Sequence, residues 1–505
     1  MLLAMVAAVA PALGASAEVG GAPSPGSPAY LARDAGNIDQ AFGRQLGPGG
    51  QLRDPAYLRA LAPDAVGTEL AQLEAQAANP TRPALTGGNL VPGWNDGNPY
   101  RRGWAGHRGR ELQVSFTDRY GALLQGDVFA PLDRARDPYT GARLRGPYPG
   151  VVIVTGSVQA SAGVYAWLAE DLAERGYVVL TFDVAGQGRS ETMPHQGPNP
   201  DLPGCSLSSP GGSGEVTPCP GVPSEQAQNF VDGAEDAITF FLSTPARAYP
   251  DRGAGSARVN RFNPLWALVD HRPDLHSATP GRTTKLALIG HSTGAVTVSY
   301  LQGVDRRVET VAALDKLTAT ASSINDVGAA LGTLPGAVRP EVPALALQSE
   351  YGFEPQPYWL AGCSSFDPCP GSPEMAPPPA REEATGFDVW RSAGVDSMII
   401  VPRASTHLEY ADVPFVLPAS AWGQAMASYY VQAWLDKYLK HDPGADRLLT
   451  ATTLHYLQPG SGGLWRPVTI SRDSHLSFYF CSGYAFRLAD GRRISSPDLI
   501  ADGCR

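Results

Sequence analysis

Hydrophobic and polar positions change their spacing from one segment of this chain to the next. Residues 111–116 and 123–129 alternate apolar and polar side chains around the segment 118–121, which predicts an antiparallel hairpin. The runs at 150–156 and 177–183 are instead almost continuously apolar. Strands of this kind are typical of parallel sheets whose two faces are both covered by helices.

Helical patterns separate these apolar runs and continue the alternation towards the C-terminus. Further strands are expected at 286–289, 308–315, 344–349 and 397–401, and helices at 164–174, 224–242, 295–301 and 425–438. The sequence therefore predicts an α/β protein with a mostly parallel, doubly wound sheet and helices on both faces.

The composition indicates several long irregular segments, because the 505 residues include 46 Pro and 56 Gly. Two long Pro- and Gly-rich insertions, 190–223 and 246–283, are expected either to form a lid or substrate rim or to decorate the surface. We divide the chain into a signal peptide (1–17), an N-terminal extension (18–110) with a helix expected at 64–78, a central α/β domain (111–450), and a small β-rich C-terminal extension (451–505).

The first 17 residues resemble a secretory signal, because an apolar stretch ends in the small residues Ala15-Ser16-Ala17. We predict cleavage after Ala17 and a secreted protein with no stable membrane span, since the stretch is too short and Ala-rich to cross a bilayer. An uncleaved anchor at a lipid surface is the alternative. The net charge of −10 argues against a nucleic-acid partner, which requires a basic surface.

The six cysteines fall into three local pairs, which favours disulfides in an oxidising compartment. Each pair brackets a Pro/Gly-rich loop or a terminal tail, and no C-x-x-C spacing or Cys/His cluster indicates a metal site. Nearest-neighbour closure predicts the bonds Cys205–Cys219, Cys363–Cys369 and Cys481–Cys504.

The most informative motif is Gly290-His291-Ser292-Thr293-Gly294, which lies between a predicted strand and a predicted helix. A serine in this G-x-S-x-G context sits on a strained turn that exposes its hydroxyl at the edge of the sheet. Ser292 is therefore the candidate nucleophile. The alternative is a Gly-rich turn whose serine only caps the helix.

A nucleophilic serine needs a histidine base and an acid that orients it, expected in the order Ser, acid, His. Four of the nine histidines follow Ser292, and His407 comes directly after the last apolar strand, where a loop can bring it over the serine. The other three are His441 after the last predicted helix, and His455 and His475 in the C-terminal extension.

Two carboxylates compete for the role of the acid. Asp315 ends the strand after the motif, and Glu350 follows the next strand. Asp315 is preferred because it is the shorter side chain at an abrupt strand end; Glu350 is the alternative, with Glu354 and Asp326 as lesser candidates. The oxyanion hole is expected to use the backbone N–H groups of Thr293 and Ser157, with Val158 next in line.

Together with the stretch Gly-Gln-Gly-Arg-Ser at 186–190, these segments resemble the α/β-hydrolase superfamily over about residues 110–445, which implies an α/β-hydrolase catalytic domain. The stretches at 176–183 and 430–442 are similar to the secreted cutinase and polyester-hydrolase group, which is related to the dienelactone hydrolases. That group's acid lies at the position of Gly352 in this chain. The stretch 312–315 resembles the platelet-activating-factor acetylhydrolase group, whose acid matches Asp315.

The resemblance implies serine esterase chemistry without a metal or an organic cofactor. The expected substrates are carboxylic esters, either small molecules or lipid-like, acyl or polymeric esters. An amidase or peptidase on the same scaffold is one alternative, and a non-catalytic binding protein that has kept the fold is another.

Overall fold

A computed structural model of the chain describes residues 23–24, 27–78, 97–157, 161–191, 227–255, 257–318, 339–352, 355, 357, 386–413 and 419–500. The expected signal peptide (1–17) lies outside these residues. The same holds for most of the insertion at 190–223 and for Val158, Asp326, Glu354 and every cysteine except Cys481. Cys481 is disulfide-bonded, but the three expected pairings stay predictions.

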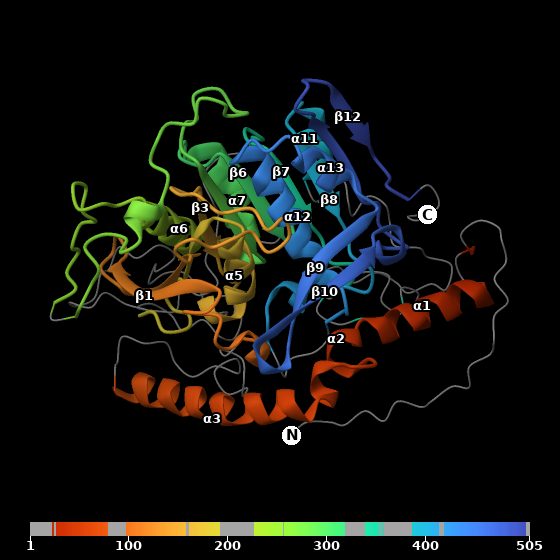
Figure 1. Cartoon of the computed structure of the whole chain (residues 1–505), viewed down its shortest axis with the longest axis horizontal. Helices are drawn as coiled ribbons and strands as arrows, with labels where there is room; N and C mark the ends of the chain where they lie inside the picture. Colours follow the sequence, from red (N-terminus) through yellow and green to blue (C-terminus); the bar gives the residue numbers. More distant parts are fainter. Residues whose placement is uncertain are drawn as a thin grey trace, which may run out of the picture.

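In the described part of the chain, ten strands form one large sheet through the centre of the molecule (Figure 1). The six inner strands are parallel, and antiparallel strands close both edges. In spatial order the strands are β1 (Gly109–Thr117), β2 (Leu123–Pro131), β4 (Val178–Phe182), β3 (Gly150–Val154), β5 (Leu286–His291), β6 (Thr310–Leu314), β7 (Ala344–Leu347), β8 (Ser397–Ile400), β11 (Gly483–Arg487) and β12 (Arg493–Ser496).

Each inner strand packs side chains on both faces of the sheet, because successive residues of a strand point in opposite directions. In β3, Val152 and Val154 belong to one hydrophobic core, and Val151 and Ile153 belong to the other. The first core is covered by α6 (Ala227–Phe241) and α7 (Thr293–Val304), and the second by α5 (Ala166–Glu174) and α12 (Gly423–Tyr438). The expected α/β-hydrolase-like fold is therefore confirmed.

The remaining helices are short or lie near the termini. The helix expected at 64–78 begins earlier, as α3 (Pro55–Ala78), because Pro55 suits a first helical position and Asp54 accepts the N–H of Ala56. A 3₁₀ turn, η3 (Ala162–Tyr165), precedes α5. The other helices among the described residues are α1 (Pro28–Gln40), α2 (Gly43–Leu46), α11 (Phe387–Ser392), α13 (Ala445–Thr450) and the 3₁₀ turns η1 (Gln51–Arg53), η2 (Pro99–Arg101), η5 (Trp266–Leu268), η6 (His407–Tyr410), η7 (Ser461–Gly463) and η8 (Asp473–His475).

The C-terminal residues contribute to two different sheets. β9 (Thr453–Gly460) and β10 (Leu464–Ser471) form a separate antiparallel pair, whereas β11 pairs with β8 and extends the central sheet. The segment 451–505 was predicted as a small β-rich C-terminal extension. The sequence contains no information about which strand β11 pairs with.

The first helix, α1, packs against two segments that lie far from it in the sequence. Its residues Tyr30, Asp34 and Asn37 lie on one face and are buried. The Tyr479 hydroxyl donates to Asp34, and the Asn37 side chain donates to Glu350. The N-terminal extension thus reaches the loop that follows β7.

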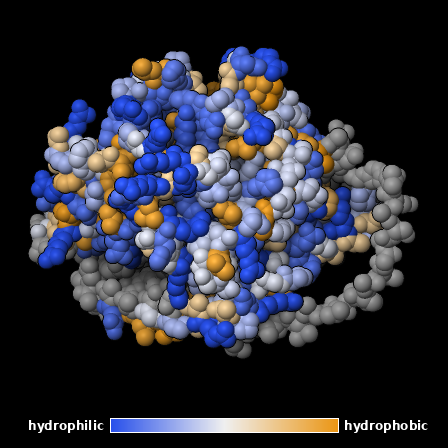
Figure 2. Space-filling model, viewed as in Figure 1, coloured by the Kyte–Doolittle hydropathy of each residue, from blue (hydrophilic) through white to orange (hydrophobic). Residues whose placement is uncertain are grey.

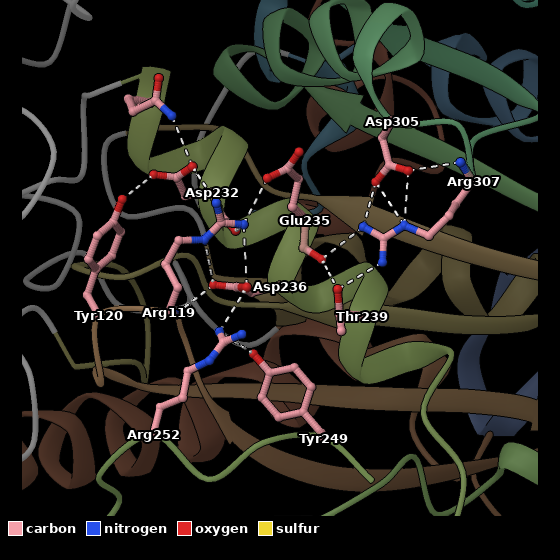
Figure 3. A network of polar contacts seen from close by, with 11 residues as sticks. Arg119, Tyr120, Asp232, Glu235, Asp236, Thr239, Tyr249, Arg252, Asp305 and Arg307 are labelled. Carbon is pink, nitrogen blue, oxygen red and sulfur yellow. Dashed lines mark hydrogen bonds and ion pairs between the residues drawn. The ribbon is translucent and has the colours of Figure 1, made fainter. Parts of the chain in front are cut away.

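An ion-pair network connects the acidic side of α6 to neighbouring loops (Figure 3). The carboxylates of Asp232, Glu235 and Asp236 converge on Arg119 in the β1–β2 turn, and Arg252 adds a second cation to Asp236. Networks hold geometry better than isolated surface pairs, which contribute little. The face of the molecule in Figure 2 shows hydrophilic and hydrophobic side chains interspersed.

The described part of the insertion at 246–283 packs along the β1 edge of the sheet and reaches the amino end of β3. Asn260 donates its N–H to Ser115 of β1, and the segment at Leu268 pairs with Tyr148, just before the amino end of β3. Ser115 is level with the carboxyl end of β4, so the contact at Asn260 lies at the same end of the sheet as Ser292, whereas the contact at Leu268 lies at the other end. The role of this insertion as a lid, a substrate rim or a surface element stays a prediction. No described helix is both long and apolar enough to cross a membrane.

Candidate active site

The turn between β5 and α7 places Ser292 in a conformation that L-residues rarely adopt, with φ at 56° and ψ at −121°. The flanking glycines make this turn feasible. A Cβ on Gly290 would lie 2.0 Å from the carbonyl oxygen of Gly294, and a Cβ on Gly294 would lie 2.3 Å from that of Val154. Side chains are excluded at both positions, so the sequence motif reflects a steric requirement.

Asp315 and His407 are brought together from the carboxyl ends of β6 and β8. Oδ2 of Asp315 lies 2.6 Å from Nδ1 of His407. Ser349, two residues past β7, donates its hydroxyl to the same oxygen at 2.6 Å and its N–H to Oδ1 at 3.1 Å. Burial alone would raise the pKa of the Asp315 carboxyl, but the hydrogen bonds from His407 and Ser349 outweigh it and hold that pKa below its ordinary value.

Glu350, the alternative acid, occupies a different environment. Its buried carboxylate accepts hydrogen bonds from the Asn37 side chain and the Ala404 N–H, each at 2.5 Å, and from the Ser477 hydroxyl at 2.6 Å. Burial raises the pKa of Glu350, and these donors only partly offset it. The carboxylate that faces His407 is therefore that of Asp315.

The contacts of Glu350 shape the loop that carries His407. Ala404 has a φ of 59°, which is costly for a residue with a Cβ, and its N–H is the one that Glu350 binds. The backbone N–H of His407 donates to the carbonyl of Gly352 at 2.9 Å. The loop after β7 thus holds the loop after β8 by both side-chain and backbone bonds.

The loop after β3 lies beside Ser292. A Cβ added to Gly156 would be 3.2 Å from the Cβ of Ser292, so the backbone of this loop approaches the serine closely. The N–H of Gly156 donates to the Tyr165 hydroxyl at 2.9 Å, and its carbonyl accepts from Nε2 of Gln187 at 2.9 Å. The following residue is Ser157, whose N–H was the expected oxyanion donor.

His291, expected only as part of the motif, makes two contacts of its own. Its Nδ1 lies 2.8 Å from the Tyr165 hydroxyl, and its Nε2 lies 2.8 Å from the carbonyl oxygen of His407. Burial, reinforced by the neighbouring His407, lowers the pKa of His291 to about 3. The ring is therefore neutral at ordinary pH.

The other late histidines have partners away from these residues. His441 contacts Asp274 at 2.8 Å, at the opposite end of the sheet. His455 contacts Thr469, and His475 contacts the carbonyl of Ser471. Of the described histidines that follow Ser292, His407 is the one that meets a carboxylate at the carboxyl ends of the parallel strands.

Three polar residues of this site were not singled out from the sequence as site residues. Ser349 adjoins Glu350 but carries no motif, and Tyr165 lies on a 3₁₀ turn with no distinguishing pattern. Gln187 belongs to the Gly-Gln-Gly-Arg-Ser stretch at 186–190, which carried part of the family resemblance and was the one available signal. Among the described residues, no group of three or more His, Cys, Asp or Glu side chains is arranged to hold a metal ion.

Comparisons with known proteins give weak similarities. No protein-family model matches the chain. An uncharacterised protein of Pseudomonas aeruginosa is 33% identical over 90 residues, which are 18% of this chain and 22% of that protein. A ferulic acid esterase from Streptomyces cinnamoneus aligns over 70% of this chain and 94% of its own, with 17% identity and a TM-score of 0.38. Similarity at this level indicates nothing about activity.

Proposed function

We propose that this protein is a serine hydrolase that cleaves carboxylic esters through an acyl-enzyme on Ser292. The observation that supports this most strongly is the 2.6 Å contact between Asp315 and His407 next to a serine held at a φ of 56°. In a catalytic triad the serine is the nucleophile and the histidine is its base. The aspartate orients the histidine and stabilises its protonated form.

In the proposed reaction, Ser292 Oγ attacks the ester carbonyl carbon while His407 takes the serine proton at Nε2. Asp315 holds Nδ1–H and stabilises the imidazolium that forms. The negative charge on the carbonyl oxygen is bound by the N–H groups of Thr293 and Ser157. His407 then returns the proton to the departing alcohol, and a water molecule repeats both steps to release the acid.

The substrates are proposed to be lipid-like, acyl or polymeric carboxylic esters, and hydrolysis of p-nitrophenyl esters tests this. We expect the wild-type protein and a Ser115→Ala control to hydrolyse short- or long-chain esters, and Ser292→Ala to lose turnover. Ser115 lies on β1, which three strands separate from β5, and its hydroxyl donates to the carbonyl of Arg258. Turnover of p-nitroanilides instead of esters would indicate an amidase, and turnover of neither would indicate a binding protein.

We also propose that the protein is exported and that its signal peptide is removed after Ala17. The disulfide at Cys481 supports this, since such bonds persist in oxidising compartments. N-terminal sequencing of the protein recovered from the culture medium should begin at Glu18. Recovery only from the cytoplasm, with residues 1–17 intact, would contradict export.

A further inference from the structure

Two buried side chains, Tyr165 and His291, join the loop beside Ser292 to the loop that carries His407. The chain of contacts runs from the Gly156 N–H to the Tyr165 hydroxyl, then to Nδ1 of His291, and from its Nε2 to the carbonyl oxygen of His407. All three heavy-atom distances are 2.8 or 2.9 Å. Tyr165 is 1% exposed and His291 is 3% exposed, so water does not compete for these bonds.

The two ends of this chain fix the direction of each hydrogen bond. A backbone N–H can only donate and a carbonyl oxygen can only accept. Because the His407 carbonyl accepts, Nε2 of His291 must carry the proton. The neutral ring then has an unprotonated Nδ1, which accepts from Tyr165 while the Tyr165 oxygen accepts from Gly156.

A second contact fixes the other side of the same loop. Nε2 of Gln187 binds the carbonyl of Gly156. In a trans peptide the carbonyl and the following N–H point in opposite directions. Gln187 therefore sets the direction of the Ser157 N–H, while Tyr165 occupies the N–H of Gly156.

We propose that Tyr165 and His291 are positioning residues, which keep the 155–157 loop and the His407 loop at a fixed separation around Ser292. The inference rests on the proposed esterase function, because it concerns where the oxyanion donors and the base stand during acyl transfer. Neither side chain is proposed to touch the substrate. Each acts by hydrogen bonding to the backbone, Tyr165 to the Gly156 N–H and His291 to the His407 carbonyl.

Replacement of the Tyr165 hydroxyl tests this directly. Tyr165→Phe should lower kcat roughly ten- to a hundredfold, less than the roughly 10²- to 10³-fold loss for removing an oxyanion donor outright. KM should change by no more than about twofold, because substrate binding in the ground state does not use the displaced donor. The affinity for butylboronic acid, which forms a tetrahedral anion on the serine, should fall in parallel with kcat.

The matched control is Tyr430→Phe, which also removes a hydroxyl from a fully buried tyrosine. The Tyr430 hydroxyl makes no hydrogen bond among the described residues. This variant should keep wild-type kcat and boronate affinity. At His291, a Gln side chain offers both a donor group and an acceptor, so His291→Gln should keep most of the activity that His291→Leu loses.

A measurement on the histidine rings does not depend on ester turnover. In nitrogen NMR of ¹⁵N-histidine-labelled protein, one ring should stay neutral with its proton on Nε2 as the pH falls to about 5, well above the lowered pKa of His291. His291→Gln should remove that signal. A His291 ring that carries its proton on Nδ1, or that titrates above pH 5, would overturn the inference.

The outcomes separate this inference from the proposed function. If the wild-type protein hydrolyses esters and Tyr165→Phe keeps wild-type kcat and boronate affinity, the positioning role is wrong and the esterase proposal stands. If the wild-type protein hydrolyses no ester and binds no boronate, both proposals fail. A kcat loss with parallel boronate weakening and unchanged KM supports the positioning role.

Discussion

The hydroxyl of Ser349 donates to Oδ2 of Asp315, the same oxygen that faces Nδ1 of His407. A carboxylate oxygen that accepts from two side chains is held in place and kept ionised, which accounts for the lowered pKa of Asp315. The loop after β7, where the alternative acid Glu350 also lies, thus contributes hydrogen bonds to Asp315, the proposed acid at the end of β6.

Replacing Asp315 by Asn should abolish most of the ester hydrolysis. An amide keeps the volume but does not favour the His407 tautomer that carries its proton on Nδ1, so kcat should fall by about 10³- to 10⁴-fold. Steady-state hydrolysis of a p-nitrophenyl ester measures this. The comparison variant is Glu350→Gln, which should lower thermal stability and reduce kcat by less than about tenfold, since Glu350 acts on His407 through the loop that carries it. The reverse ranking would make Glu350 the acid.

Ser349→Ala should reduce kcat by roughly tenfold and leave KM unchanged. The variant removes one hydrogen bond to a charged group, and such bonds contribute about 1.5–3 kcal/mol. The Ser349 N–H still donates to Oδ1, so Asp315 stays partly anchored. Equal kcat values for Ser349→Ala and wild type would show that the contact has no part in orienting the acid.

Gly290→Ala should prevent the turn at Ser292 from forming. The added Cβ would lie 2.0 Å from the Gly294 carbonyl oxygen, so the protein should be unstable or inactive. Gly36→Ala in α1 is the matched control, because nothing lies within 4 Å of its Cβ and alanine favours the helix interior. Thermal unfolding should show a lower Tm for the first and an equal or higher Tm for the second. A Gly290→Ala protein with wild-type Tm and activity would refute the steric account.

The stability of the protein should fall as the pH is lowered, in part because of His291. Its folded-state pKa is lowered to about 3, against an ordinary value near 6.5. Above the ordinary value neither state binds the proton, and the contribution to stability is complete. Between the two pKa values the unfolded chain binds one proton more than the folded protein. The free energy of unfolding therefore falls by up to about 1.4 kcal/mol for each pH unit by which the pH is lowered.

Urea unfolding of wild type and His291→Gln over this pH range measures that contribution. The variant should show a shallower decline between about pH 6.5 and pH 4, because it lacks the titrating ring. Parallel curves for the two proteins would mean that His291 has no lowered pKa in the folded state.

The strand pattern and the G-x-S-x-G motif were sufficient to predict the fold class from the sequence. Parallel strands that are buried on both faces appear in the sequence as apolar runs, and the turn requires its glycines for steric reasons. Both features are therefore visible in a short stretch of sequence. The preference for Asp315 rested on its place at the end of a strand. The structure brings that side chain to His407.

The contacts that depend on distant pairing could not be predicted. Asn37 and Glu350 are 313 positions apart, and β11 pairs with a strand that precedes it by more than 80 residues. Neither contact has a local signature, because an amide on a helix or a short strand fits many partners. Tyr165 and Ser349 are equally ordinary in sequence, and their importance follows only from which buried atoms they satisfy.

The most direct test of the account is labelling with a fluorophosphonate followed by peptide mapping. The central claim is that Ser292 is a nucleophile activated by His407 and Asp315. Mass spectrometry should find a single phosphonate adduct on Ser292 in the wild-type protein, and labelling should be far slower in Asp315→Asn. No adduct, or an adduct on another residue at the same rate in both proteins, would contradict the claim.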